Sequence, residues 1–77
     1  MDRPQAFGQA VKEARHGCRL TQEELAEIAK LHSNYISLIE RGLTNPALDT
    51  IFALASALGT LPSKLMARAE ELSRNSD

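Results

Sequence analysis

Reactive side chains are few and scattered in this chain of 77 residues. Cys18, His16 and His32 are of the types that act in nucleophilic catalysis or bind a transition metal. Cys18 has no predicted histidine partner, the two histidines lack a metal-ligand spacing, and no glycine-rich phosphate loop is present. We therefore expect no enzymatic activity, no metal site and no cofactor.

Side chains suited to hydrogen-bonded recognition are instead concentrated in the segment from Ser33 to Arg41. An asparagine such as Asn34 can bond to adenine through two hydrogen bonds, and a serine hydroxyl can donate or accept at a base edge. Ser33, Asn34 and Ser37 could alternatively be the solvated start of a helix. Leu38 could contact a thymine methyl group or pack inward. The recognition hypothesis predicts contacts to DNA bases by Ser33, Asn34, Ser37 and Leu38.

Turn signals divide the chain into five segments with the spacing of amphipathic helices. They fall at Gly17, at residues 30–32, at residues 42–46 and at residues 59–62. We expect an all-α fold of five helices in one compact domain, residues 1–77, because so short a chain cannot hold a second core. The residues expected to face the core are Phe7, Ala10, Val11, Ala14, Leu25, Ile28, Ala29, Tyr35, Ile36, Ile39, Leu48, Ile51, Leu54, Ala55, Leu58 and Leu65.

Several helix ends can be assigned from local motifs. Thr21 and Glu24 have the capping-box spacing, so the second helix should begin there. Gly17 should end the first helix, while Gly42 and Gly59 should end the third and fourth in the left-handed conformation that glycine favours. Pro62 suits the first turn of a fifth helix, about residues 62–73.

The formal charge of −1 argues against a strongly basic nucleic-acid-binding surface. A DNA-binding interpretation therefore needs an uneven distribution, with Arg15, Arg19, Lys30 and Arg41 toward the DNA. The single cysteine favours the reducing cytoplasm. No apolar run approaches the roughly 20 residues of a membrane span, so we expect a soluble cytoplasmic protein with no membrane partner.

The chain resembles the helix-turn-helix family of phage lambda-type repressors and Cro proteins from about Phe7 to Leu65. The matching runs are Leu20-Thr21-Gln22-Glu23, Leu25-Ala26, Tyr35-Ile36-Ser37, Ile39-Glu40-Arg41-Gly42, Asn45-Pro46-Ala47-Leu48, and Ala55 with Leu58. The resemblance implies a lambda-repressor-like domain whose helix-turn-helix, about residues 21–41, binds a palindromic double-stranded operator as a homodimer. Such a protein regulates transcription as a repressor or an activator. The small size and the Leu31-His32 and Asn-Tyr-Ile-Ser runs are similar to restriction-modification controller proteins.

The resemblance also implies roles for residues around the third helix. Glu40 is expected to form a partly buried structural ion pair with Arg15, so that its carboxylate does not meet DNA. Lys30 stands where the family often has glycine, so it should adopt the left-handed conformation at a cost of about 1 kcal/mol. Ala47 replaces the usual capping residue before the fourth helix. The expected phosphate ligands are Gln22, Arg41, Thr44, Asn45 and Arg19, of which Arg19 could equally be a solvated surface residue.

Two surfaces have alternative interpretations. The apolar stripe of the fifth helix either forms a dimer interface or completes the core. We expect both, with Leu65 facing the core and the dimer interface formed by Leu61, Met66, Ala69 and Leu72. The acidic residues Glu23, Glu24 and Glu27 either form a solvated helix face or contact RNA polymerase. An alternative function is an antitoxin-like interaction module that sequesters a partner protein.

Overall fold

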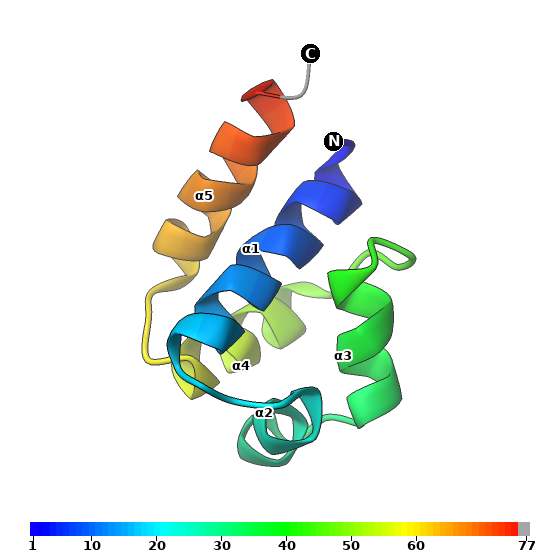
Figure 1. Ribbon diagram of the computed structural model, residues 1–77, viewed down its shortest axis with the longest axis vertical. Helices are drawn as coiled ribbons and strands as arrows, with labels where there is room; N and C mark the ends of the chain where they lie inside the picture. Colours follow the sequence, from blue (N-terminus) through cyan, green and yellow to red (C-terminus); the bar gives the residue numbers. More distant parts are fainter. Residues whose placement is uncertain (76–77) are drawn as a thin grey trace.

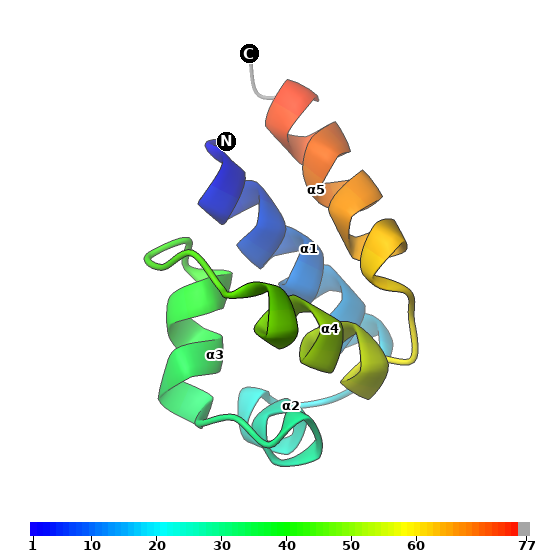
Figure 2. The same ribbon diagram turned by 180° about the vertical axis from the view of Figure 1, so that it is seen from behind.

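The computed structural model describes residues 1–75, and over that range it contains five α-helices joined by short loops (Figure 1). This confirms the predicted all-α, five-helix architecture. Helix α1 lies between α3 and α5, and α2 packs against α3 and α4. Seen from behind, α4 lies in front of α1, between α3 and α5 (Figure 2). The helices are α1 (Arg3–Gly17), α2 (Gln22–Ala29), α3 (Ser33–Glu40), α4 (Leu48–Ala57) and α5 (Pro62–Asn75).

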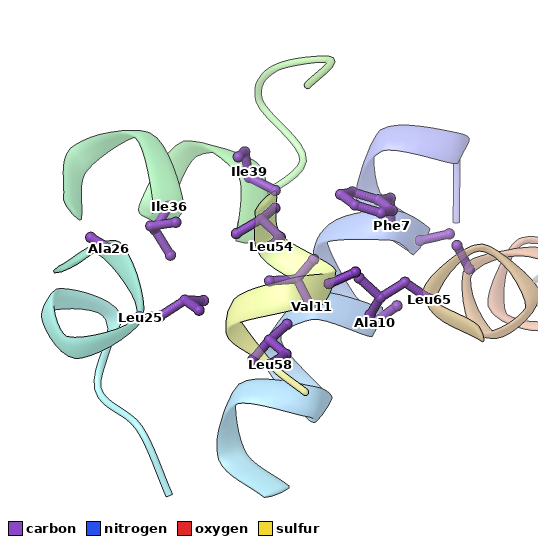
Figure 3. Close-up of a cluster of buried hydrophobic side chains, with 13 residues drawn as sticks. Phe7, Ala10, Val11, Leu25, Ala26, Ile36, Ile39, Leu54, Leu58 and Leu65 are labelled. Carbon is purple, nitrogen blue, oxygen red and sulfur yellow. The ribbon is translucent and has the colours of Figure 1, made fainter. Parts of the chain in front are cut away.

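All five helices contribute apolar side chains to one core, shown in Figure 3. Burial of such side chains is worth about 1.5–3 kcal/mol each, and it is the main force that holds short helices together. The largest fully buried residues are Val11, Leu25, Ile36, Ile39 and Leu54.

Three apolar residues differ in exposure from the sequence-based prediction. Ile28 is 54% exposed because the buried residues of α2 are Leu25 and Ala26, so the face that meets the core is turned away from Ile28. Leu48 is 69% exposed because it is the first residue of α4, beyond the edge of the core. Ala69, expected at a dimer interface, is only 6% exposed and packs in the core one helical turn after Leu65. Ala69 is therefore a core residue of α5.

The first helix is longer than its apolar pattern suggests. Asp2 is its N-cap: the backbone N–H of Gln5 donates to Asp2 Oδ1 at 2.8 Å, and the Asp2 N–H donates to Gln5 Oε1 at 3.2 Å. Gly17 is its last residue, as predicted, but Arg19, with a φ of 59°, takes the left-handed position. These ends give α1 a length of 15 residues, and it runs between α3 and α5 (Figure 1).

The backbone at the other helix ends follows the predictions. Thr21 and Glu24 form the complete capping box of α2, and Pro62 is the first residue of α5. Gly42 and Gly59 have φ values of 72° and 69°. Lys30 has a φ of 60°, so this lysine accepts a conformation that glycine would adopt without strain.

Two contacts of α1 fix its neighbours. Gly8 lies so close to α3 that an added Cβ would overlap the carbonyl oxygen of Ile39 and lie 2.8 Å from that of Glu40. On the opposite side, Arg68 of α5 donates to Glu13 through Nε at 2.8 Å and Nη2 at 3.1 Å. The close crossing and the ion pair hold α3 and α5 against α1.

Candidate nucleic-acid interface

The helix pair α2–α3 presents a polar groove on the surface. The inner face of α3 is buried through Ile36 and Ile39, so its other face remains open to solvent. The groove between the N-terminal ends of α2 and α3 is lined by Arg15, Arg19, Leu20, Thr21, Gln22, Glu23, Ser33, Asn34 and Ser37. It therefore brings together three of the predicted base-contact residues and two of the predicted phosphate ligands.

The recognition residues differ in exposure along α3. Asn34 is exposed, Ser33 and Ser37 are half-buried at the groove, and Leu38 is 36% exposed. Leu38 thus lies at the surface and does not pack inward. An α-helix with its side chains is about 10–12 Å in diameter, which fits the roughly 12 Å width of the DNA major groove. The exposed face of α3 has the size and chemistry needed to read base edges.

Arg15 and Glu40 form the ion pair that the resemblance implies. Arg15 Nε lies 2.7 Å from Glu40 Oε2, and Nη2 donates to Oε1 at 2.9 Å. The two side chains are 9% and 3% exposed, and these hydrogen bonds raise the pKa of the Arg15 guanidinium above its ordinary value. Arg15 Nη1 also donates to the Leu20 carbonyl at 2.8 Å. One guanidinium thereby joins α1, α3 and the loop that leads into α2.

Gln22, the first residue of α2, is half-buried and bonded within the protein. Its Nε2 donates to Glu40 Oε1 at 3.1 Å. The backbone N–H groups of the first turn of α2 have no acceptor within the helix. One of them, the N–H of Glu24, donates to Oγ1 of the N-cap Thr21 at 3.1 Å. Together with the positive end of the helix dipole, they make this position suitable for a phosphate oxygen.

The remaining predicted phosphate ligands lie at the two ends of α3. Arg19 is exposed beside the groove, at the N-terminal end. Arg41 is exposed at the C-cap, with its Nε donating to the Ser37 carbonyl at 3.4 Å, and Thr44 and Asn45 follow in the next loop. Candidate phosphate ligands therefore flank the recognition face on both sides.

Sequence reasoning did not place Glu23 in this groove. Glu23 is exposed in the second position of α2, where a carboxylate is favoured by the helix dipole, and it lines the groove beside Gln22. Glu24 is different from the other acidic residues, because its carboxylate accepts the Thr21 N–H at 2.9 Å in the capping box. Glu23, Glu24 and Glu27 are all exposed and together carry the acidic charge of α2.

A family model described as Helix-turn-helix matches residues 11–65, which include α2, α3 and α4. The chain belongs to this helix-turn-helix family. It is a DNA-binding regulator, and α3 is the second helix of the predicted helix-turn-helix. The resemblance to lambda-type regulators, inferred from the residues alone, is confirmed.

Similar curated proteins include two control proteins. Control protein C.SmaI of Serratia marcescens is 41% identical over 68 residues, which cover 88% of this chain and 81% of that protein. Control protein C.BamHI of Bacillus amyloliquefaciens is 44% identical over 61 residues, covering 78% and 75% of the two chains. The immunity repressor of Bacillus phage phi105 is 44% identical over 59 residues, which cover 77% of this chain and 41% of the repressor. None of these three names describes a protein that sequesters a partner.

Solved structures agree with the fold. The restriction-modification controller protein C.AhdI from Aeromonas hydrophila has a TM-score of 0.79 at 39% identity, covering 80% of this chain and 94% of that chain. The clp gene regulator ClgR from Corynebacterium glutamicum has a TM-score of 0.91 at 23% identity, covering 99% and 82%. The second match bears on the fold alone.

The described residues contain neither a candidate metal-ligand cluster nor a single helix that could span a membrane. No group of three His, Cys, Asp or Glu side chains among them could hold a metal ion. No single helix in that range is long and apolar enough to cross a membrane; α4 and α5 pass the length and composition test only as a pair, bent by 104°.

Proposed function

We propose that this protein regulates transcription by binding a palindromic operator as a homodimer, as a controller of a restriction-modification system. The observation that carries the proposal is the groove in which Arg19, Gln22, Ser33, Asn34 and Ser37 lie together at the start of the recognition helix. Residues of these types can bind phosphates and read base edges in one register. The proposed location of the protein is the cytoplasm.

In the proposed complex, α3 enters the major groove. Asn34, Ser33 and Ser37 meet base edges, and Leu38 meets a thymine methyl group. Arg41, Thr44 and Asn45 bind phosphates along one wall of the groove, and Gln22 and Arg19 bind phosphates along the other. Because the net charge of the chain is only −1, affinity depends on this local placement of charge and not on a generally basic surface.

The proposed dimer interface lies on α4 and α5. A single recognition helix reads only a few base pairs, so two copies on adjacent half-sites are needed to select one site. Met66 and Leu61 are 47% and 58% exposed, and Phe52 is 56% exposed on the same face of α4 as Leu48. Leu72, also predicted at the interface, is half-buried and packs against the core. A second copy would cover these apolar side chains.

Control of a restriction-modification system is supported by the relatives. Two similar proteins are named control proteins, and the C.AhdI structure is that of a restriction-modification controller. If this chain also activates transcription, the exposed Glu23, Glu24 and Glu27 are the proposed contacts for RNA polymerase. Genes for a restriction enzyme and a methyltransferase beside its own gene are therefore expected.

Binding to a selected operator tests the DNA-binding role. We expect log Kd to rise with log salt by about 0.9 for each phosphate contact. Asn34→Ala should weaken operator binding by about 1–3 kcal/mol and relax the base preference, whereas Arg41→Ala should weaken binding to all duplexes alike. Lys64→Ala, which removes an exposed cation from α5, is the control and should change neither property. An Asn34→Ala variant with unchanged affinity and base preference would contradict the assignment.

A further inference from the structure

A hydrogen-bond network connects the predicted phosphate ligand Gln22 to the buried ion pair. Glu40 Oε1 accepts from both Arg15 Nη2, at 2.9 Å, and Gln22 Nε2, at 3.1 Å. A carboxylate has no proton to donate, so it can face only the amino group of the Gln22 amide and not its carbonyl oxygen. Glu40 thereby selects one of the two orientations of that amide.

Glu40 can serve this purpose near DNA because Arg15 balances its charge. Arg15 contacts both carboxylate oxygens, and the two side chains are 9% and 3% exposed. The third hydrogen bond of Arg15 goes to the Leu20 carbonyl, two residues before Gln22. The same pair of residues therefore holds both the start of α2 and the side chain at its first position.

We propose that Glu40 is a positioning residue for DNA binding that acts through Gln22. Glu40 takes one N–H of the Gln22 amide and leaves the second N–H, already oriented, for a phosphate oxygen at the groove. A glutamine side chain that is ordered before binding avoids the entropy cost of ordering it in the complex. The inference rests on the proposed function, and it gives Glu40 a role beyond holding α3 against α1.

A double-mutant cycle measures this role. The Kd of the full chain for a selected operator and for a random duplex is measured for wild type, Gln22→Met, Glu40→Gln and the double variant. Gln22→Met keeps the length of the side chain and removes its donors. We expect Gln22→Met to raise Kd about three- to tenfold on both duplexes. Glu40→Gln should raise Kd clearly less in the Gln22→Met background than in wild type. Equal factors in the two backgrounds would overturn the proposal.

An NMR measurement on wild-type protein does not depend on whether the Glu40 variant folds. In the free protein, the Gln22 side-chain amide should be more rigid and exchange its protons more slowly than the exposed amide of Asn34. Addition of the operator should then shift the Gln22 amide protons without a large change in its rigidity. A Gln22 amide as mobile as that of Asn34 in the free protein would also overturn the proposal.

These outcomes are separable from failure of the proposed function. If wild type bound no duplex in a salt-dependent manner, DNA binding itself would be wrong, and the positioning role would fall with it. If wild type bound its operator and the cycle showed no coupling, only the positioning role would fail.

Discussion

At the scale of single residues, Lys30 occupies the most strained position of the helix-turn-helix. Its φ of 60° and ψ of 44° lie in the left-handed region, which costs a residue with a side chain about 1 kcal/mol. The conformation allows the next residue, Leu31, to donate its N–H to the Ala26 carbonyl at 2.8 Å and so close the end of α2. The strained backbone of Lys30 is therefore part of the turn that sets the direction of α3 relative to α2.

Lys30→Gly should therefore stabilise the protein. We expect a gain of up to about 1 kcal/mol, reduced by the greater freedom of glycine in the unfolded chain, and a rise of a few degrees in Tm. Thermal unfolding followed by circular dichroism measures it. Lys30→Ala is the matched control, because it removes the same charge but keeps the backbone strain. The explanation is wrong if the glycine variant melts no higher than the alanine variant.

The sequence predicts residue conformations well where a local motif determines them. The capping box of Thr21 and Glu24 and the left-handed Gly42 and Gly59 depend on neighbours within a few positions. The left-handed Lys30 was expected from the family resemblance, and the left-handed Arg19 was not predicted. The hydrogen bond from Gln22 to Glu40 spans 18 positions and depends on how α2 and α3 pack. Site details of this tertiary kind could be seen only in the structure, and the Arg15–Glu40 pair was foreseen through the family resemblance alone.

At the scale of elements, Gly8 determines how closely α1 approaches α3. A Cβ at Gly8 would meet the backbone of Ile39 and Glu40, which cannot rotate away as a side chain would. Gly8→Ala should therefore push α3 outward and destabilise the fold by about 1–3 kcal/mol, the usual cost of overpacking. Urea unfolding measures the loss, and operator affinity should fall with it because α3 carries the recognition residues.

Gly17→Ala provides the control for this substitution within the same helix. Nothing lies within 4 Å of a Cβ at Gly17, so alanine should stabilise α1 by up to about 1 kcal/mol through its higher helix propensity. Opposite signs for the two substitutions are the expected result. If both stabilised the protein, the α1–α3 crossing would not need a glycine.

The contact between α1 and α5 should depend on pH. The hydrogen bonds from Arg68 hold the pKa of the Glu13 carboxyl below its ordinary value near 4.5. A carboxylate with a lowered pKa in the folded state stabilises the protein above the unfolded-state pKa, and this contribution is lost as the pH falls through the folded-state pKa. The ion pair should therefore stabilise the α1–α5 contact at pH 7 and lose that effect below about pH 4.5.

Thermal unfolding of wild type and Glu13→Gln tests the pH dependence. Wild type should melt slightly higher at pH 7, and the difference in Tm should shrink between pH 4.5 and pH 3. The effect should be small because the Glu13 and Arg68 side chains are 38% and 42% exposed. Glu71→Gln is the control, since Glu71 is 61% exposed and 3.8 Å from Arg68. A Tm difference for Glu13→Gln that stays constant over this range would contradict the prediction.

The existence of each helix was predictable, but its buried face was less so. Apolar spacing identifies a helix because one side must face the core. It does not decide whether Ile28 or Ala26 joins Leu25 on the buried face, since both are apolar neighbours of Leu25 on the helix surface. Packing of α2 against α3 and α4 selects the stripe that includes Ala26 and leaves Ile28 exposed. The exposure of Leu48 likewise depends on where the core ends, which no single helix encodes.

At the scale of the whole molecule, the proposed DNA-reading surface and the proposed dimer surface lie on different helices. The recognition groove lies between α2 and α3, whereas the exposed Phe52 and Met66 belong to α4 and α5. In Figure 1, α3 and α5 lie on opposite sides of α1. A second copy could therefore bind through α4 and α5 while both recognition helices remain open to DNA.

Self-association through α4 and α5 is the prediction that belongs to this scale. Sedimentation velocity at micromolar concentration should show a dimer for wild type and a monomer for the double variant Phe52→Glu with Met66→Glu. Each protomer of the variant would bring two unpaired carboxylates to the two-fold interface, and their burial would be strongly unfavourable. Both side chains are about half exposed, so the variant should keep its helical circular dichroism. Leu43→Glu, at a position 62% exposed in the loop after α3, should remain dimeric.

Operator affinity of the double variant should fall at least about tenfold, because each monomer would bind its half-site alone. A wild-type monomer, or a double variant that still dimerises, would show that these helices are not the interface.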